Sequence, residues 1–192
     1  MSPESSAEHG KWHNSRAPHT VAVMDALSPH DPCRKVVAKF SAQSGKTEIL
    51  NNFAGYIMAQ NPGPTLVVQP NQRPMGEAFS KDRLAPMIRD TPAISAKVIE
   101  AKGKDKKNTI FHRTFPGGHL TIAGASSPAQ LASRPIQFLL CDEIDRWVPT
   151  KEGDALNLAI KRTLTFWNRK ILMVSTPTLD GRGIDAQYED TL

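Results

Sequence analysis

Short apolar runs alternate with segments of helical periodicity along most of this chain. The apolar runs predict buried strands at residues 35–40, 65–69, 137–141 and 170–175. Apolar residues at helical spacing predict helices at 21–27, at 49–60, at 72–89 with a bend near Pro86, and at 156–164. Strands that alternate with helices favour an α/β fold with a largely parallel sheet, whose functional residues gather where the strands end.

Two segments depart from this alternation. Residues 109–115 and 119–123 alternate in polarity around Pro116-Gly117-Gly118, which predicts a β-hairpin. Five lysines lie among few apolar residues between Lys97 and Lys107. We interpret this stretch as a solvated loop, and contact with a phosphate backbone is the alternative.

The turn between the first strand and the next helix has the composition of a phosphate-binding loop. It reads Ser41-Ala42-Gln43-Ser44-Gly45-Lys46-Thr47, and its N–H groups would converge on an anion together with the helix N-terminus. Lys46 would reach the β- and γ-phosphates of a nucleotide, and the Thr47 hydroxyl would bind Mg²⁺. The usual pattern has a glycine where this chain has Phe40, so either the turn differs or the match is accidental.

An acid pair follows a fully apolar run about a hundred residues later. Phe138-Leu139-Leu140-Cys141 leads directly into Asp142 and Glu143, as expected of a buried parallel strand that delivers acids at its carboxyl end. Asp142 could hold a metal ion, and Glu143 could orient and deprotonate water. Asp145, two residues on, is expected to be a helix or loop residue rather than a second metal ligand.

Two further positions complete the predicted chemistry. Ser175 and Thr176 close a third strand that should neighbour the acid strand, where a hydroxyl could sense the γ-phosphate. Arg134 stands just upstream of the acid strand and is our candidate for an arginine that stabilises the transition state, with Arg73 and Arg162 as rivals. These residues predict an ATP hydrolase that uses Mg²⁺.

Composition adds bounds on size and partners. At 192 residues the chain suits one well-cored domain, which we place at 32–192, after a leader at 1–31 that begins rich in Ser, Pro, His and Gly. The net charge of 24 − 19 = +5 modestly favours a polyanionic partner. Without an apolar window of roughly 18 residues or a signal-peptide core, we expect a cytosolic protein with no membrane partner. Cys33 and Cys141 support neither a zinc site nor a disulfide framework.

With these elements in order, the chain resembles the ATPase domain of the phage terminase large subunit, in the lambda-like GpA family. The resemblance covers about residues 10–192. The matching stretches are Met24-Asp25-Ala26-Leu27-Ser28, Lys39 with Ser41-Ala42-Gln43-Ser44-Gly45-Lys46-Thr47-Glu48, Leu131-Ala132-Ser133-Arg134-Pro135, Leu140-Cys141-Asp142-Glu143-Ile144-Asp145 and Ser175-Thr176-Pro177-Thr178.

The resemblance implies a P-loop NTPase with a RecA/helicase-like core and a motor that packages double-stranded DNA into the procapsid in the host cytoplasm. It implies a small terminase subunit, the portal protein and further copies of this chain as partners. Lys46 and Thr47 carry over as phosphate-loop residues, Asp142 and Glu143 as the metal-holding and catalytic acids, and Ser175-Thr176-Pro177 as the coupling motif. Terminases are known for a phosphate loop without the first glycine, so Phe40 fits this family.

Two departures from the family pattern matter. Pro18-His19-Thr20 replaces the more usual aromatic residue or glutamine on the adenine side, which leaves recognition of the base open. The chain also stops shortly after the coupling motif, so we expect a truncated protein that lacks the C-terminal nuclease domain and does not cut DNA.

Several alternatives remain at this stage. A helicase-like or restriction-type DNA translocase would carry similar acids, but it would need arginines from a second motor domain. A GTPase switch would need a base-reading Asn-Lys-x-Asp, and a small-molecule kinase would need a substrate lid; neither is found. An inactive prophage remnant of a terminase would fold without binding nucleotide.

Overall fold

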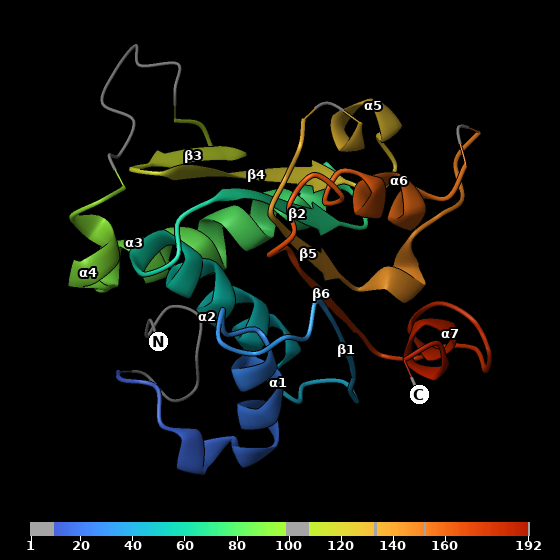
Figure 1. The fold of residues 1–192 in the computed structure, drawn as a ribbon, viewed down its shortest axis with the longest axis horizontal. Coiled ribbons are helices and arrows are strands. Elements are labelled where there is room, and N and C mark those ends of the chain that lie inside the picture. The colour runs from blue at the N-terminus through green and yellow to red at the C-terminus, as the bar shows by residue number, and fades with distance from the viewer. Residues whose placement is uncertain (1–9, 99–107, 133, 152, 192) are drawn as a thin grey trace.

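A computed structural model describes residues 10–98, 108–132, 134–151 and 153–191 (Figure 1). The strands are β1 (Lys35–Lys39), β2 (Pro64–Gln69), β3 (His112–Phe115), β4 (Gly118–Gly124), β5 (Phe138–Asp142) and β6 (Lys170–Ser175). They form one sheet in the order β1-β6-β5-β2-β4-β3. All neighbours pair in parallel except β3, which is antiparallel to β4. The predicted α/β class with a mostly parallel sheet is confirmed.

Helices cover both faces of this sheet. The α-helices are α1 (Val21–Ala26), α2 (Lys46–Ala59), α3 (Ala85–Asp90), α4 (Pro92–Ser95), α5 (Pro128–Leu131), α6 (Ala155–Lys161) and α7 (Ile184–Glu189). Shorter turns are the 3₁₀ segments η1 (Asn14–Arg16), η2 (Pro18–Thr20) and η5 (Ile144–Arg146), and the π-helical segments η3 (Gln72–Gly76) and η4 (Phe79–Leu84). None of the helices in the described ranges is long and apolar enough to span a lipid bilayer.

The central strands are apolar throughout because both of their faces are buried. Val67, Leu140 and Leu172 belong to the core under α1, α2, α3 and α4. Their neighbours Leu66, Leu139 and Met173 belong to a second core under α5 and α6. Figure 1 shows these two helical layers on opposite sides of the sheet. The period of two along each strand therefore separates two hydrophobic cores.

The register of the sheet aligns the carboxyl ends of four strands. Lys39 at the end of β1 pairs with Ser175 at the end of β6, and Val174 pairs with Asp142 at the end of β5. Val68 of β2 pairs with Cys141, so Gln69 lies level with Asp142. The segments that follow these strands consequently leave the sheet at one edge.

Two predicted elements are shorter than expected. The helix predicted at 156–164 ends at Lys161, because the carbonyl of Arg162 instead accepts the N–H of Ile136 at 3.0 Å. The strand predicted at 109–115 begins only at His112, because Thr109 and His112 exchange backbone hydrogen bonds in a tight turn. The lysine-rich stretch lies largely outside the described residues, at 99–107.

A buried lysine fastens the N-terminal segment to the sheet. Lys170, the first residue of β6, is 5% exposed and its Nζ donates to the carbonyls of Ala26, Asp31 and Cys33 at 2.9, 2.7 and 2.6 Å. Burial lowers the pKa of this lysine. Three acceptors around one ammonium group meet its full donor capacity away from water. The division into a leader and a domain at residues 31 and 32 stays a prediction.

Candidate phosphate and metal site

The predicted phosphate loop turns at Gln43 and Gly45, which have positive φ values, and not at Phe40. Gln43 and Gly45 have φ values of 57° and 89°, in the left-handed region, and α2 begins directly after Gly45. Alternation of this kind turns successive backbone N–H groups to one side and makes an anion-binding concavity. Phe40 is not among the residues with positive φ, and its N–H donates to the carbonyl of Ser175 at 3.2 Å. The absent glycine is therefore no obstacle to the turn.

Lys46 ties the loop to the end of β6. Its side chain is almost fully buried, and Nζ donates to the carbonyl of Ser41 at 2.8 Å and to the hydroxyl of Thr176 at 2.6 Å. The Ser44 hydroxyl donates to the same Ser41 carbonyl at 2.7 Å. Thr47 is half-buried on the first turn of α2. The structure thus brings Lys46 and Thr176, which are 130 positions apart, into direct contact.

Asp142 is a buried carboxylate with one uncompensated oxygen. Only 5% of the residue is exposed; Oδ2 accepts from Nε2 of Gln69 at 3.0 Å, and Oδ1 has no partner among the described residues. Burial raises the pKa of Asp142 to about 6, and the Glu143 charge adds to the rise, whereas the Gln69 hydrogen bond and the Lys46 charge oppose it. A buried carboxylate oxygen without a donor is a site that a cation would satisfy.

Glu143 leaves the strand in an unfavourable backbone conformation. Its φ and ψ are both 50°, and a left-handed non-glycine residue costs about 1–2 kcal/mol. The Glu143 N–H donates to the carbonyl of Val174 at 2.9 Å, and Oε2 lies 3.6 Å from Nε of Arg146. Strained residues concentrate at functional sites, where the surrounding structure holds them.

The end of β6 lies between the phosphate loop and the acids. The predicted pairing of the Ser175 strand with the acid strand is confirmed by the β5–β6 ladder. Ser175 is buried and its hydroxyl accepts the N–H of Asp145 at 3.2 Å, whereas Thr176 contacts Lys46. The two hydroxyls of the predicted coupling motif therefore contact opposite sides of the site.

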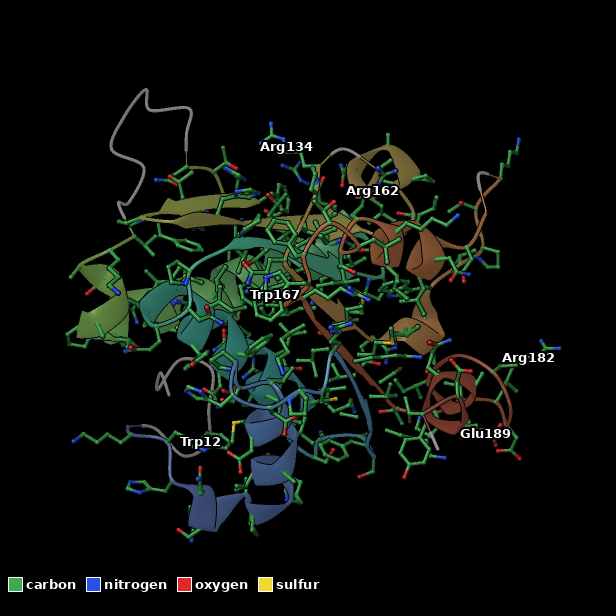
Figure 2. The ribbon with its side chains drawn as sticks, in the orientation of Figure 1. Trp12, Arg134, Arg162, Trp167, Arg182 and Glu189 are labelled. Carbon is green, nitrogen blue, oxygen red and sulfur yellow. The ribbon has the colours of Figure 1, made fainter. Side chains whose placement is uncertain are left out.

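Arg134 lies away from this site in the same chain. Its charge contributes to lowering the pKa values of His112 and His119, behind the larger effect of burial. His119 pairs with Pro64, the first residue of β2. The two histidines and Arg134 therefore lie towards the amino ends of the parallel strands, whereas Asp142 lies at their carboxyl ends. Figure 2 shows Arg134 at the margin of the molecule, beside α5. A role for Arg134 within its own site is not supported by this placement.

The two rival arginines have other partners or positions. Arg73 follows β2 at the carboxyl edge, where its Nε lies 3.4 Å from Oε2 of Glu77 and its guanidinium lies 5.5 Å from the ring centre of Phe111. Arg162 follows α6, and its buried Nε has no partner in the described part of the chain. These placements give neither arginine a contact with the phosphate loop as the structure describes it.

The sequence did not predict the hydrogen bond between Gln69 and Asp142 or the contact of His19 with the phosphate loop. Gln69 was visible as a polar residue at the end of an apolar run, the same kind of position as Asp142. His19 places Nε2 2.9 Å from the carbonyl of Ser44, and its ring packs edge-on to Phe40 with centroids 5.7 Å apart. Asp145 lies in η5, as the expected helix or loop residue.

The arrangement combines a concavity of N–H groups with the buried Lys46 ammonium, the hydroxyls of Thr47 and Thr176, and the carboxyls of Asp142 and Glu143. Such a set is suited to hold a polyphosphate and a divalent cation side by side. Among the described residues, no group of three or more Asp, Glu, His or Cys side chains is arranged so that it could hold a metal ion by itself.

Comparison with known proteins gives consistent matches. The family model described as phage terminase large subunit gpA, ATPase domain, matches residues 6–191. The terminase large subunit of Enterobacteria phage P21 is 27% identical over 181 residues, which cover 93% of this chain and 28% of that protein. This chain therefore spans little more than a quarter of the length of that relative.

Solved structures match in fold. The large terminase of a thermophilic bacteriophage gives a TM-score of 0.65 at 14% identity, over 91% of this chain and 42% of that one. The same thermophilic-phage terminase in complex with ATP-γ-S gives 0.63 at 16% identity, over 92% and 42%. The large terminase ATPase domain of Thermus phage P74-26 gives 0.56 at 16% identity, over 90% and 67%. The fold is that of these ATPase domains, as the sequence predicted.

Replacement of Asp142 by Asn should stabilise the protein without nucleotide. At pH 7.5 we expect the free energy of unfolding to rise by about 1–3 kcal/mol, because a neutral amide avoids the cost of burying a charge. Urea denaturation followed by circular dichroism measures the change. Asp82→Asn, at an exposed position in η4, is the control and should stay within about 0.5 kcal/mol.

The stability gained by Asp142→Asn over the parent protein should depend on pH. The folded-state pKa of Asp142, about 6, lies above the ordinary value of 3.8, so the folded state holds the extra proton between these values. Asp142 therefore makes stability fall as the pH rises through this window, and the advantage of Asp142→Asn should vanish towards pH 4. An advantage that is independent of pH, or a loss of stability at pH 7.5, would contradict this account.

Proposed function

We propose that this chain, which belongs to the gpA family of phage terminase large subunits through its ATPase domain, binds and hydrolyses ATP to drive packaging of double-stranded DNA. The observation that carries the proposal is the meeting of Lys46, Thr176 and Asp142 at one sheet edge. Lys46 contacts the Thr176 hydroxyl, and its charge also acts on the Asp142 carboxyl. ATP as the nucleotide is supported by the ATP-γ-S complex of the thermophilic-phage terminase.

Mg²⁺ fits the residues present. The unpartnered Oδ1 of Asp142 and the Thr47 hydroxyl on the first turn of α2 are oxygen ligands of the kind that Mg²⁺ takes together with phosphate oxygens. Asp142 and Thr47 would hold the ion. When bound, Mg²⁺ neutralises charge on the phosphates and so favours their transfer.

The other residues position the phosphates and water. The backbone of Ser41 to Gly45 would hold the phosphates, and Lys46 would turn from Thr176 to an oxygen of the terminal phosphates. Glu143, which directly follows β5 with a left-handed backbone, would orient the attacking water and accept its proton. Ser175 and Thr176 would respond to loss of the γ-phosphate.

The N-terminal segment would form the base side of the nucleotide site. His19 stands against the loop through its contacts with Ser44 and Phe40, which supports residues 1–31 as an adenine-side segment. The imidazole ring of His19 offers a flat face on which a base could stack.

The wider assembly follows from the family. We propose double-stranded DNA, the small terminase subunit, the portal protein of the procapsid and further copies of this chain as partners, in the host cytoplasm. A net charge of +5 supports a polyanionic partner. A nuclease domain would lie in other parts of the relatives, since this chain covers 28% of the P21 protein.

Two substitutions separate binding from turnover. Lys46→Ala should abolish hydrolysis and weaken ATP binding, because it removes the buried ammonium that reaches the phosphates. Glu143→Gln should retain ATP affinity within about threefold and lower kcat by at least about 100-fold. Calorimetry with Mg·ATP and phosphate release measure the two quantities.

Matched controls keep these results specific. Lys81→Ala and Glu189→Gln change exposed residues of the same types and should behave as the parent protein. Parental turnover in Glu143→Gln would refute the assigned role of Glu143. Absence of ATP binding by the parent chain would favour an inactive remnant.

Stimulation by DNA tests the motor assignment. Linear double-stranded DNA should raise the ATPase rate at about 50 mM salt, and the stimulation should fall steeply by about 200 mM because phosphate contacts release counterions. A steady-state ATPase assay at both salt concentrations provides the measurement. An ATPase rate that ignores DNA at both would count against a motor that tracks the phosphate backbone.

Arg134 remains a candidate for an arginine supplied to a neighbouring subunit. Its place at the far edge of the sheet, exposed at the margin of the molecule, supports action outside its own site. Arg134→Ala and Glu143→Gln should each be inactive alone, and mixing them should restore part of the activity because each supplies what the other lacks. Full activity of Arg134→Ala alone, or no recovery on mixing, would reject the idea.

A further inference from the structure

Asp145 has a carboxylate whose two oxygens are both committed to the chain that follows β6. Oδ1 accepts the N–H of Thr178 at 3.1 Å and the Thr178 hydroxyl at 3.2 Å. Oδ2 accepts the N–H of Ile184, the first residue of α7, at 3.0 Å. One side chain thus holds both ends of the connection between β6 and α7.

The same residue belongs to the turn that carries the acids. Asp145 lies two positions after Glu143, and its backbone N–H donates to the Ser175 hydroxyl at 3.2 Å. Asp145 therefore joins the turn after β5 to the end of β6 through both its backbone N–H and its carboxylate.

The connection also starts at the phosphate site. Thr176 accepts the hydrogen bond of Lys46, and Thr178, bound to Asp145, follows two residues later. The continuous path runs from the Lys46 ammonium through Thr176 and Thr178 to Asp145 and the start of α7. Each link is a hydrogen bond or one or two peptide units.

A second carboxylate anchors α7 independently of the acid turn. Oδ1 of Asp185 lies 2.6 Å from Nζ of Lys39 at the end of β1, and its Oδ2 accepts the N–H of Gly181 at 2.6 Å. The residues at 177–182 are exposed, and Leu179 is 58% exposed. With little packing to hold it, the position of this loop depends on the contacts of Asp145 and Asp185.

Gly183 leaves room for the Asp145 carboxylate. Its φ is 56°, and a Cβ at this position would lie 2.6 Å from Oδ1 of Asp145. A side chain at position 183 would therefore push the Asp145 carboxylate away from Thr178 and Ile184. This offers a second, independent way to disturb the Asp145 contact.

We infer that Asp145 is a positioning residue that couples occupation of the phosphate site to the loop at 176–183 and to α7. The inference rests on the proposed function and extends it to regulation of the same site. A bound phosphate draws the Lys46 ammonium, which has the Ser41 carbonyl and the Thr176 hydroxyl as acceptors in this structure, towards its own oxygens, and Thr176 loses its contact in that movement. Asp145 passes this change to α7 because it holds Thr178 and Ile184 together.

Hydrogen exchange of backbone amides tests this coupling, with Mg²⁺ and ATP-γ-S as the probe and the 192-residue chain as the protein. In the parent, the probe should change exchange at residues 176–184 by at least about threefold. In Asp145→Asn and in Gly183→Ala the probe should still bind, within about threefold of parental affinity by calorimetry. The amides of Thr178 and Ile184 should then exchange faster and no longer respond to the probe.

Asp190→Asn is the matched control, because Asp190 directly follows α7 and its carboxylate makes a 3.3 Å surface contact with Lys35. It should respond as the parent does. A merely structural role of Asp145 would speed exchange but leave the response to the probe intact, and that result would overturn the inference.

The remaining outcomes are also decisive. Gly183→Ala carries the test if Asp145→Asn does not fold, as judged by circular dichroism and by exchange in α2. A parent that binds the probe without any change at 176–184 refutes the coupling alone. A parent that does not bind the probe in calorimetry refutes the proposed function, and the coupling with it.

Discussion

The alignment of β1, β6, β5 and β2 at their carboxyl ends is the constraint on which the site depends. Side chains cannot reach far, so Lys46, Thr176 and the acids at 142 and 143 come together only because the four strands end level with one another. A slip of one strand by one residue would exchange its side chains between the two cores, so the packing of both cores holds the register. The apolar residues of the two cores therefore determine where the polar groups at the ends of the strands lie.

The carboxyl end of β5 carries two features that usually lower the stability of a protein. Asp142 is a buried carboxyl with an oxygen that lacks a donor among the described residues, and Glu143 has a left-handed backbone without being glycine. Both lie at or one step beyond the end of a strand whose own residues are fully buried. The free-energy cost of these two features is tolerated because strand pairing and core packing hold the turn after β5 in place. Reduced stability at this turn is what a site built for charged ligands requires.

Much of the fold follows from the sequence because apolar runs and helical spacing are local signals. The strands, α2 and the hairpin lie close to their predicted places. Lys46 begins the helix that follows β1, and the acids lie at the end of β5, as expected. The contacts of Gln69 and Asp145 could not be read in this way, since each depends on which strands neighbour one another. Arg134 shows the same limit, because its proximity in sequence to the acid strand did not reveal that it lies at the opposite edge of the sheet. Phe40 shows that a loop can place its left-handed residues elsewhere.

The buried Lys170 determines how β6 can respond to events at its other end. Because its ammonium is held by three carbonyls of the N-terminal segment, the strand is clamped at its start and flanked by paired neighbours along its length. These contacts prevent β6 from shifting along its own axis. A displacement that begins at Thr176 is therefore expected to move the segment after Ser175 and to leave β6 in place, and it reaches α7 only through the contacts of Asp145 and Asp185.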